Sequence, residues 1–264
     1  MLLKIEDLDV SFRNEEGETT PAAVDVSLSL DRGEVLGLVG ESGSGKSSVA
    51  MSVARLLPSP PAFWPKGRIL FDGVDTLHLP LAELHRIRGR RIGVVFQDPM
   101  GSLSPLHRIG DQLVETVRLH RDVSAKVARE QALEWLAKVG IPDPEMRARA
   151  YPHELSGGMQ QRVMIAMGLM LDPDLLIADE PTTALDVTIQ AQVLRLLKDL
   201  HRANSAVLLI THDLGVVSQL ATRLAVMREG RVVETTDNPE EFFNNPKHPY
   251  SQALVGEARR MELK

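Results

Sequence analysis

The sequence contains no cysteine, and this absence excludes several kinds of site. A chain without thiols has no disulfide framework, no thiolate zinc site and no cysteine-bound iron–sulfur cluster. No apolar run approaches the roughly 20 residues that cross a bilayer, and we expect no signal peptide at its start. We therefore expect any membrane contact to be made through a partner.

An excess of positive charge is also missing. The net charge is −6, which argues against a general nucleic-acid-binding protein but does not exclude a local basic patch. The chain has 264 residues, of which 43% are hydrophobic, so it can form one large domain, or a domain with an inserted lobe, around a sizeable core. This composition does not favour disorder.

One short stretch, residues 40–47, fits the pattern G-x-x-x-x-G-K-[ST] at every required position. The short apolar stretch before it predicts a buried strand, and Ser47 to Leu57 predicts a helix that stops before a proline. A helix N-terminus offers unpaired N–H groups and a positive dipole to an anion. We predict a polyphosphate site in which Lys46 reaches the β- and γ-phosphates and Ser47 binds Mg²⁺. A plain Gly/Ser-rich turn before a helix is the alternative.

Polar side chains follow three other short apolar runs. The runs are 92–96, 175–178 and 206–210, and the polar residues are Gln97, Asp179 with Glu180, and His212. The end of a buried strand is well placed to meet a ligand. We predict that Asp179 holds Mg²⁺ through Ser47 and water, and that Glu180 polarises the attacking water. The alternatives are a surface acidic pair and a structural histidine.

Two further features have a structural and a functional interpretation. Ser156, Gly157 and Gly158 precede a helix predicted over Gln160 to Leu171, which is a second candidate anion site but a weak signal by itself. Phe12 is the only aromatic residue before the phosphate loop. Its side chain either packs in the core or offers a flat face to adenine.

The rest of the chain predicts strands, a helical lobe and a closing hairpin. Strands are predicted at residues 2–12 and 24–30, helices from 98 to about 150, and a hairpin turn at Glu229–Gly230. In the lobe, Ser124 is the predicted N-cap of a helix that ends near Gly140, with Trp135 in the core. The arginine-rich run from His85 to Arg91 has the pattern of a solvated face.

Taken together, these motifs resemble those of the ATP-binding subunit of ABC transporters along nearly the whole chain. The phosphate loop, which corresponds to Walker A, comprises Gly40, Glu41, Ser42, Gly43, Ser44, Gly45, Lys46 and Ser47, with Ser48 after it. The other matching segments are Gln97 (Q-loop), Leu155–Met159 (signature), Leu176–Glu180 (Walker B with its catalytic glutamate), Ala184–Asp186 (D-loop) and His212 (switch histidine). Phe12 stands where the family places its adenine-stacking aromatic. Met159 departs from the Gln of many members, which puts no catalytic residue in doubt.

The resemblance implies an α/β fold, with a RecA-like P-loop NTPase core, an N-terminal antiparallel β subdomain and an inserted helical subdomain. The implied boundaries are about 1–97 and 161–235 for the core with its β subdomain, about 98–160 for the helical subdomain and about 236–264 for a C-terminal tail. The implied catalytic residues are Glu180, His212 and Gln97. The implied Mg²⁺ ligands are Ser47, Gln97 and Asp179. The implied ATP contacts are the phosphate loop, Phe12, Ser156, Gly157, Gly158 and Asp186. Two chains would pair head to tail, with each ATP between the phosphate loop of one chain and Ser156–Gly158 of the other.

The resemblance also implies partners. These are transmembrane permease subunits, a second ATP-binding subunit that is identical or related, and, indirectly, an extracytoplasmic solute-binding protein. The chain would then act at the cytoplasmic face of the membrane. The rival, an ABC-type ATPase acting on nucleic acid or ribosomes, usually carries a long coiled coil, zinc-binding cysteines or two ATPase units. A non-catalytic subunit would be expected to lack the residues that correspond to Glu180 or His212, and both are present.

A finer resemblance points to the oligopeptide/dipeptide/nickel importer group. It rests on Phe96–Pro105, Gln161–Met167 and the triplet His248-Pro249-Tyr250. Many peptide-type members continue with a cysteine-containing segment, whereas this chain has no cysteine and ends 14 residues after Tyr250 (264 minus 250). We expect a peptide importer, while a nickel or metallophore importer, or one half of a fused protein, stays open. An exporter is less consistent, because exporters commonly fuse the membrane domain to the ATPase.

Overall fold

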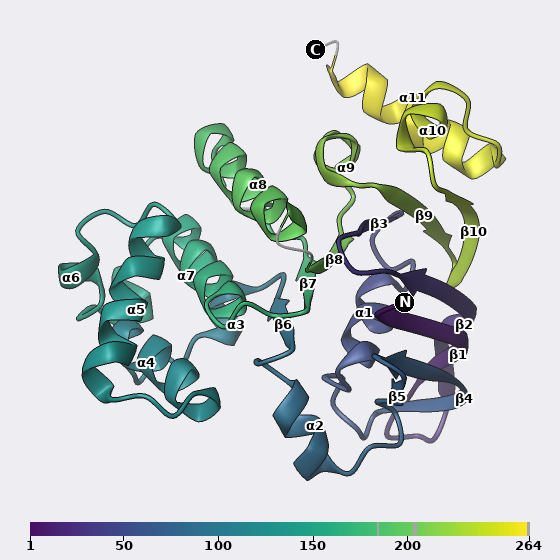
Figure 1. The fold of residues 1–264 in the computed structure, drawn as a ribbon. Coiled ribbons are helices and arrows are strands. Elements are labelled where there is room, and N and C mark those ends of the chain that lie inside the picture. Colours follow the sequence, from purple (N-terminus) through teal and green to yellow (C-terminus); the bar gives the residue numbers. More distant parts are fainter. Residues whose placement is uncertain (184, 203–204, 263–264) are drawn as a thin grey trace. The chain divides into compact units, whose positions relative to one another are not determined.

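A computed structural model describes residues 1–183, 185–202 and 205–262 (Figure 1). The protein chain divides into two compact units. Unit 1 comprises Met1–Leu84 and His201–Lys264, and unit 2 comprises His85–Leu200. Among the helices in the described ranges, none has the length and apolar character needed to cross a bilayer.

The first sheet of unit 1 is antiparallel and confirms the strands predicted near the N-terminus. Its strands, in spatial order, are β2 (Thr19–Leu30), β1 (Leu3–Arg13), β4 (Ala62–Phe71) and β5 (Val74–Asp75). Leu3, Ile5, Leu8 and Val10 are buried, which explains the alternating pattern of β1. The register shifts by a residue at several points along β1, as β-bulges require.

The second set of strands in unit 1 carries the phosphate loop. In spatial order it contains β10 (Arg231–Thr236), β9 (Arg223–Arg228), β3 (Val35–Val39) and β8 (Ala206–Ile210). β3 runs parallel to β8 and β9, and β10 pairs antiparallel with β9 in the predicted hairpin. Every residue of β3 and β8 is buried, which is why both are continuous apolar runs. Because β3 and β8 are parallel, the residues that follow them lie at one edge.

In the described part of unit 1, four helices lie wholly within the unit. They are α1 (Lys46–Val53), α9 (Leu214–Leu220), α10 (Pro239–Asn244) and α11 (Pro249–Glu262). The prediction that the first helix extends to Leu57 was wrong, because the backbone turns into the left-handed region at Arg55 (φ 49°). A core cluster joins α9, α10 and α11 to strands β3 and β9 and contains Val39, Leu214, Val217, Leu224, Val226, Phe242, Tyr250 and Val255.

In its described residues, unit 2 combines a pair of parallel strands with five α-helices and a 3₁₀ turn. Its elements are β6 (Ile92–Val95), β7 (Leu175–Asp179), α3 (Pro99–Ser102), α4 (Ile109–His120), α5 (Ala125–Lys138), α6 (Pro144–Arg147), the 3₁₀ turn η1 (Pro152–Glu154) and α7 (Gly157–Leu169). Two helices cross the boundary between the units, α2 (Leu81–Ile87) and α8 (Val187–Arg202). The teal helices of Figure 1 form the helical part of this unit.

Two predictions about these helices need correction, and one is confirmed. Ser124 caps α5 as predicted, since its hydroxyl accepts the N–H of Val127 at 3.3 Å. Trp135 is half-buried rather than in the core, and its ring contacts the ammonium of Lys138, 4.8 Å from the ring centroid. Helix α7 begins at Gly157 rather than Gln160, so both signature glycines are helical.

Candidate functional site

The phosphate loop occupies the turn between β3 and α1, the position that the sequence predicts. Gly40, Gly43 and Gly45 all have positive φ angles, of 150°, 82° and 97°. A Cβ atom on Gly45 would lie 2.1 Å from the carbonyl oxygen of Ala22, so only glycine fits there. Gly45 is also the N-cap residue of α1 and, having no side chain, makes no side-chain cap. The first N–H groups of the helix are therefore available to an anion.

Lys46 is the basic residue of this loop, and its side chain is only 6% exposed. Its Nζ donates hydrogen bonds to the carbonyl oxygens of Gly40 at 2.8 Å and Glu41 at 2.7 Å. A third contact reaches the hydroxyl of Ser44 at 3.3 Å. The ammonium group is thus held against the loop, where it suits a phosphate bound by the same loop.

His212 follows β8, so it lies at the same edge of unit 1 as Gly40. Its neighbours fix the backbone on both sides. The N–H of Asp213 donates to the hydroxyl of Thr211 at 3.0 Å, and the carboxylate of Asp213 caps α9 by accepting the N–H of Gly215 at 2.8 Å. The imidazole of His212 remains exposed at this edge.

Phe12 lies in the other sheet of unit 1. It is half-buried on β1, opposite Thr20 of β2 and Ala62 of β4. The ring is therefore neither fully in the core nor free of packing, and its role toward adenine stays a prediction.

In unit 2, two buried carboxylates end strand β7. Asp179 is 4% exposed and Glu180 is 8% exposed. Glu180 has a φ of 50°, a conformation that costs a non-glycine residue roughly 1–2 kcal/mol. The hydroxyl of Thr183 donates to Oε2 of Glu180 at 2.8 Å, which orients the carboxylate. Strain of this kind concentrates at functional sites.

Gln97 belongs to the same edge of unit 2. β6 and β7 are parallel, with Val95 opposite Ala178, so Gln97, which follows β6, and Asp179, the last residue of β7, lie at neighbouring strand ends. The side chain of Gln97 is exposed. The predicted sites thus fall into two groups, the phosphate loop with His212 in unit 1 and Gln97 with the acidic pair in unit 2.

The signature segment lies at the start of α7, which begins at Gly157 and not, as predicted, at Gln160. The hydroxyl of Ser156 accepts the N–H of Met159 at 3.3 Å and caps α7, while Ser156 and Gly157 are exposed. Arg162, one turn later, donates to the carbonyl oxygens of Gly158 and Gly140. Burial lowers the pKa of Arg162, and the nearby charge of Asp186 opposes this.

Asp186 is the D-loop residue that the sequence analysis singled out. It is exposed, and its carboxylate accepts the N–H of Ile189 at 3.0 Å at the start of α8. Ala184, two residues before it in the same motif, lies outside the described residues.

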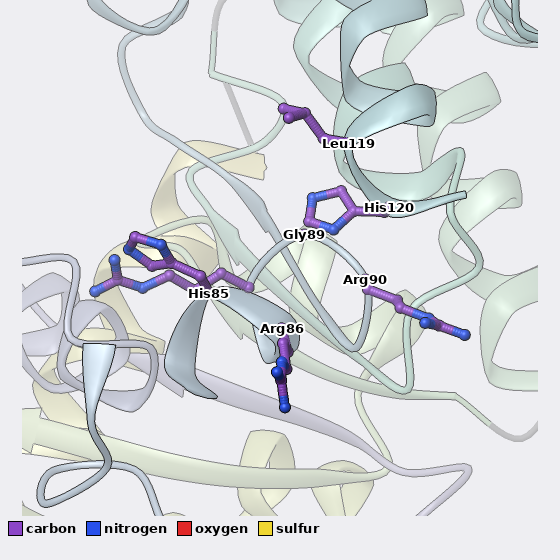
Figure 2. Close-up of a pocket in the computed structure, with 7 residues that line it drawn as sticks. His85, Arg86, Gly89, Arg90, Leu119 and His120 are labelled. Atoms are coloured by element: carbon purple, nitrogen blue, oxygen red, sulfur yellow. The ribbon is translucent and has the colours of Figure 1, made fainter. Parts of the chain in front are cut away.

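The arginine-rich run is largely solvated, as predicted, since His85, Arg86 and Arg90 are exposed and Arg88 is half-buried. Arg91 binds Asp174, with 2.6 Å between Nε and Oδ2. Other members line a cavity of about 630 Å³ in unit 2, together with residues of α4 (Figure 2). The lining residues are His85, Arg86, Arg88, Gly89, Arg90, Leu119 and His120. We call this cavity the basic pocket.

The basic pocket has a packed floor. A Cβ on Gly89 would lie 2.6 Å from Nε2 of His120, so the imidazole rests on the glycine, as Figure 2 shows. Burial and the charge of Arg90 together lower the pKa of His120 below its ordinary value of 6.5. Leu119, beside it, is 71% exposed.

Comparison with known proteins gives one family. Residues 23–183 match the ABC transporter family. The chain belongs to that family. It is 48% identical over 262 residues to the oligopeptide transport ATP-binding protein OppD of Bacillus subtilis, covering 99% of this chain and 73% of OppD. It is also 48% identical over 263 residues to the dipeptide transport ATP-binding protein DppD of the same organism, covering 99% of this chain and 78% of DppD.

Other relatives extend the comparison. A peptidoglycan transport ATP-binding protein, YejF of Agrobacterium fabrum, is 53% identical over 256 residues, and the chain spans 46% of its length. A solved dimer of an ATP-binding cassette, in a post-hydrolysis state with ADP and Pi, has a TM-score of 0.81 at 30% identity, covering 89% of this chain and 98% of the cassette. The predicted fold and family are confirmed. As a member of this family, the chain binds and hydrolyses ATP as a transporter subunit.

One residue near the site is not evident from the sequence pattern. Tyr250, in the triplet used above only as a group marker, has its hydroxyl 2.9 Å from the backbone nitrogen of Glu41. The triplet His248-Pro249-Tyr250 is the sequence signal for this residue, but it does not indicate which distant segment the tyrosine contacts.

Proposed function

We propose that this subunit powers a peptide importer. The names of OppD and DppD support this assignment, since both match nearly the whole chain at 48% identity. The nickel or metallophore alternative has no such support among the relatives described above. The observation that carries the ATPase role is the phosphate loop, in which three glycines with positive φ and a buried lysine meet at a helix start.

The loop Gly40–Ser48 binds the ATP phosphates through its backbone N–H groups, and Lys46 contacts the β- and γ-phosphates. Phe12 stacks on the adenine. Both assignments follow the family pattern and the anion-binding geometry of the loop.

The residues proposed to hold Mg²⁺ are Ser47, Gln97 and Asp179. Their donors are all oxygens, which Mg²⁺ prefers, and few protein ligands are needed because Mg²⁺ keeps waters and substrate phosphates. Within the described ranges, no group of three or more His, Cys, Asp and Glu could hold a metal ion. When bound, the ion neutralises charge that develops on the phosphates.

Hydrolysis needs a base and a phosphate sensor. Glu180 orients and polarises the attacking water. The hydroxyl of Thr183 holds the Glu180 carboxylate in place. His212 contacts the γ-phosphate from the end of β8, and Gln97 links the metal site to movement in the helical part of the chain.

Two subunits pair head to tail. Ser156, Gly157 and Gly158 of one chain meet the γ-phosphate held by the other, using the N-terminus of α7, and Asp186 lies at the same junction. The site is complete only in the pair, which excludes water from the phosphates. The second subunit is either identical or a relative.

The pair acts on permease subunits at the cytoplasmic face of the membrane, and a solute-binding protein delivers the peptide from outside. The helical subdomain, about residues 98–160, takes part in the permease contact. The basic pocket in unit 2 offers positive charge and the exposed Leu119, which suit an acidic, partly apolar permease segment.

The ATPase role is tested with Glu180→Gln. Removing the base should keep ATP binding while hydrolysis falls by roughly 10²–10⁴. Glu130→Gln, at an exposed carboxylate of α5, is the matched control and should leave turnover unchanged. Near-normal turnover in purified Glu180→Gln would remove this residue from the mechanism.

The peptide assignment needs a transport measurement. In a strain that lacks the subunit, the wild-type chain should restore uptake of a labelled dipeptide or oligopeptide, and Glu180→Gln should not. Restored nickel accumulation without restored peptide uptake would contradict the assignment.

A further inference from the structure

The C-terminal segment of unit 1 reaches the phosphate loop through a single side chain. The hydroxyl of Tyr250 accepts a hydrogen bond from the backbone N–H of Glu41 at 2.9 Å, across 209 positions of sequence. The tyrosine is only 7% exposed. It belongs to the same core cluster as Val39, the last residue of β3 before the loop.

The triplet His248-Pro249-Tyr250 explains why this tyrosine is fixed in place. Nδ1 of His248 accepts the N–H of Tyr250 at 3.1 Å, and Pro249 takes the first position of α11, where its missing N–H costs nothing. The carboxylate of Glu234, on β10, accepts the N–H groups of Lys247 and His248, both at 2.9 Å. The start of α11 is therefore tied to the hairpin as well as to the core.

The same hairpin touches the loop a second time. The N–H of Gly230 donates to the carbonyl oxygen of Ser44 at 3.1 Å. Arg228, at the end of β9, places its guanidinium 5.1 Å from the centroid of the Tyr250 ring, a cation–π distance. The hairpin and Tyr250 thus both contact the phosphate loop and stabilise its conformation.

Tyr250 is suited to accept this hydrogen bond as a neutral phenol. Burial is the largest cause that raises its pKa above 10.0; the Glu41 carboxylate raises it further, and the Glu41 N–H opposes both. The hydroxyl therefore keeps its proton at neutral pH.

The contact falls on the peptide unit that positions Lys46, the lysine proposed to contact the phosphates. The N–H of Glu41 and the carbonyl of Gly40 belong to one planar peptide, and in the trans form they point in opposite directions. Tyr250 holds the N–H, while the carbonyl accepts the ammonium of Lys46 at 2.8 Å. Fixing one side of this plane fixes the acceptor on the other side.

We propose that Tyr250 is a positioning residue for ATP. It sets the Gly40–Glu41 peptide plane and so preorganises Lys46 and the loop for the phosphates. The proposal rests on the function proposed above for the loop. It also gives the C-terminal triplet a role: it couples the docking of α11 to nucleotide affinity.

The test is ATP binding by the isolated subunit carrying Tyr250→Phe. This change removes one hydroxyl and keeps the ring beneath Arg228. Loss of one hydrogen bond should weaken ATP binding by about 2- to 10-fold. Exchange of the Glu41 amide proton with solvent should accelerate, because its acceptor is gone. The control is Tyr151→Phe, at the only other tyrosine, whose ring contacts Arg108 and stacks on His153.

Two results would overturn the proposal. One is unchanged ATP affinity in Tyr250→Phe. The other is a weaker affinity with unchanged exchange at Glu41, since the effect would then not pass through this hydrogen bond. ATP binding by Lys46→Ala, measured in parallel, distinguishes a failure of the Tyr250 proposal from a failure of the proposed function. If Lys46→Ala binds ATP normally, the assignment of the loop itself is wrong.

A measurement on the wild-type chain covers the case in which the variant does not fold. Tyrosine labelled at Cζ gives two NMR signals, one from each tyrosine. Adding ATP should shift the signal of Tyr250 and leave that of Tyr151 in place. An unmoved Tyr250 signal would contradict the proposal.

Discussion

Replacing glycines of the phosphate loop by alanine separates two physical causes that the sequence pattern cannot distinguish. Gly43 and Gly45 are two positions apart, and both have left-handed φ angles, of 82° and 97°. A Cβ on Gly43 meets nothing within 4 Å, whereas a Cβ on Gly45 would lie 2.1 Å from the carbonyl oxygen of Ala22. Gly43→Ala therefore adds only backbone strain, and Gly45→Ala adds strain and a collision with strand β2.

The two costs can be estimated. Left-handed strain in an alanine is roughly 1–2 kcal/mol, and overpacking a tight site adds about 1–3 kcal/mol. The free energy of unfolding should thus fall by about 1–2 kcal/mol in Gly43→Ala and by about 2–5 kcal/mol in Gly45→Ala. For a chain of this size, 1 kcal/mol corresponds to roughly 2–4 °C in the unfolding midpoint.

The assay is thermal unfolding without nucleotide, followed by circular dichroism, because bound ATP would add its own stabilisation. We expect Gly45→Ala to lower the midpoint by about twice as much as Gly43→Ala or more. Equal losses would refute the reasoning, since they would mean that Ala22 does not limit the space beside Gly45.

Three further predictions concern single side chains. Lys46→Ala should lose both ATP binding and hydrolysis, because the charge that faces the β- and γ-phosphates is removed; an unchanged affinity in a nucleotide titration would contradict its role. His212→Ala should impair hydrolysis and peptide uptake more than ATP binding, and normal uptake in a transport-deficient strain would exclude it as the γ-phosphate contact. Arg90→Ala should raise the pKa of His120 toward its ordinary value while burial keeps it below, as measured by NMR titration; an unmoved or lower pKa would mean that Arg90 does not act on this imidazole.

Much of the fold and of the site could be predicted because the signals are local. The alternation of β1 reflects the two-residue period of a half-buried strand, and the strands that precede Gly40 and Thr211 are apolar throughout because they are buried on both faces. The phosphate loop is likewise encoded in eight consecutive residues. Parallel pairing then brings strand ends to a common edge, as with Gln97 and Asp179.

What could not be predicted depends on contacts distant in sequence. The helix that starts at Lys46 ends at Val53 because of the conformation of Arg55, for which the composition gives no warning. Trp135 suits a core by residue type, yet it is half-buried beneath Lys138. The hydrogen bond from Glu41 to Tyr250 spans the chain, so the triplet could mark a group but not reveal a contact.

The central claim is that each ATP site is completed by the signature segment of a second chain, and Ser156→Arg tests it most directly. The matched control is Ser124→Arg. Both serines cap a helix of unit 2 by accepting an N–H at 3.3 Å, so both variants lose a cap worth about 1 kcal/mol. Only Ser156 is proposed to meet the phosphate of the partner.

The measurement pairs nucleotide affinity of the isolated subunit, by titration, with ATP-driven dimer formation, by light scattering in a Glu180→Gln background that blocks hydrolysis. We predict that Ser156→Arg binds ATP nearly as well as the wild type but does not dimerise, and that Ser124→Arg does both. Loss of ATP affinity in the Ser156→Arg monomer would mean that Ser156 acts within its own chain. Normal dimer formation by Ser156→Arg would contradict the head-to-tail account.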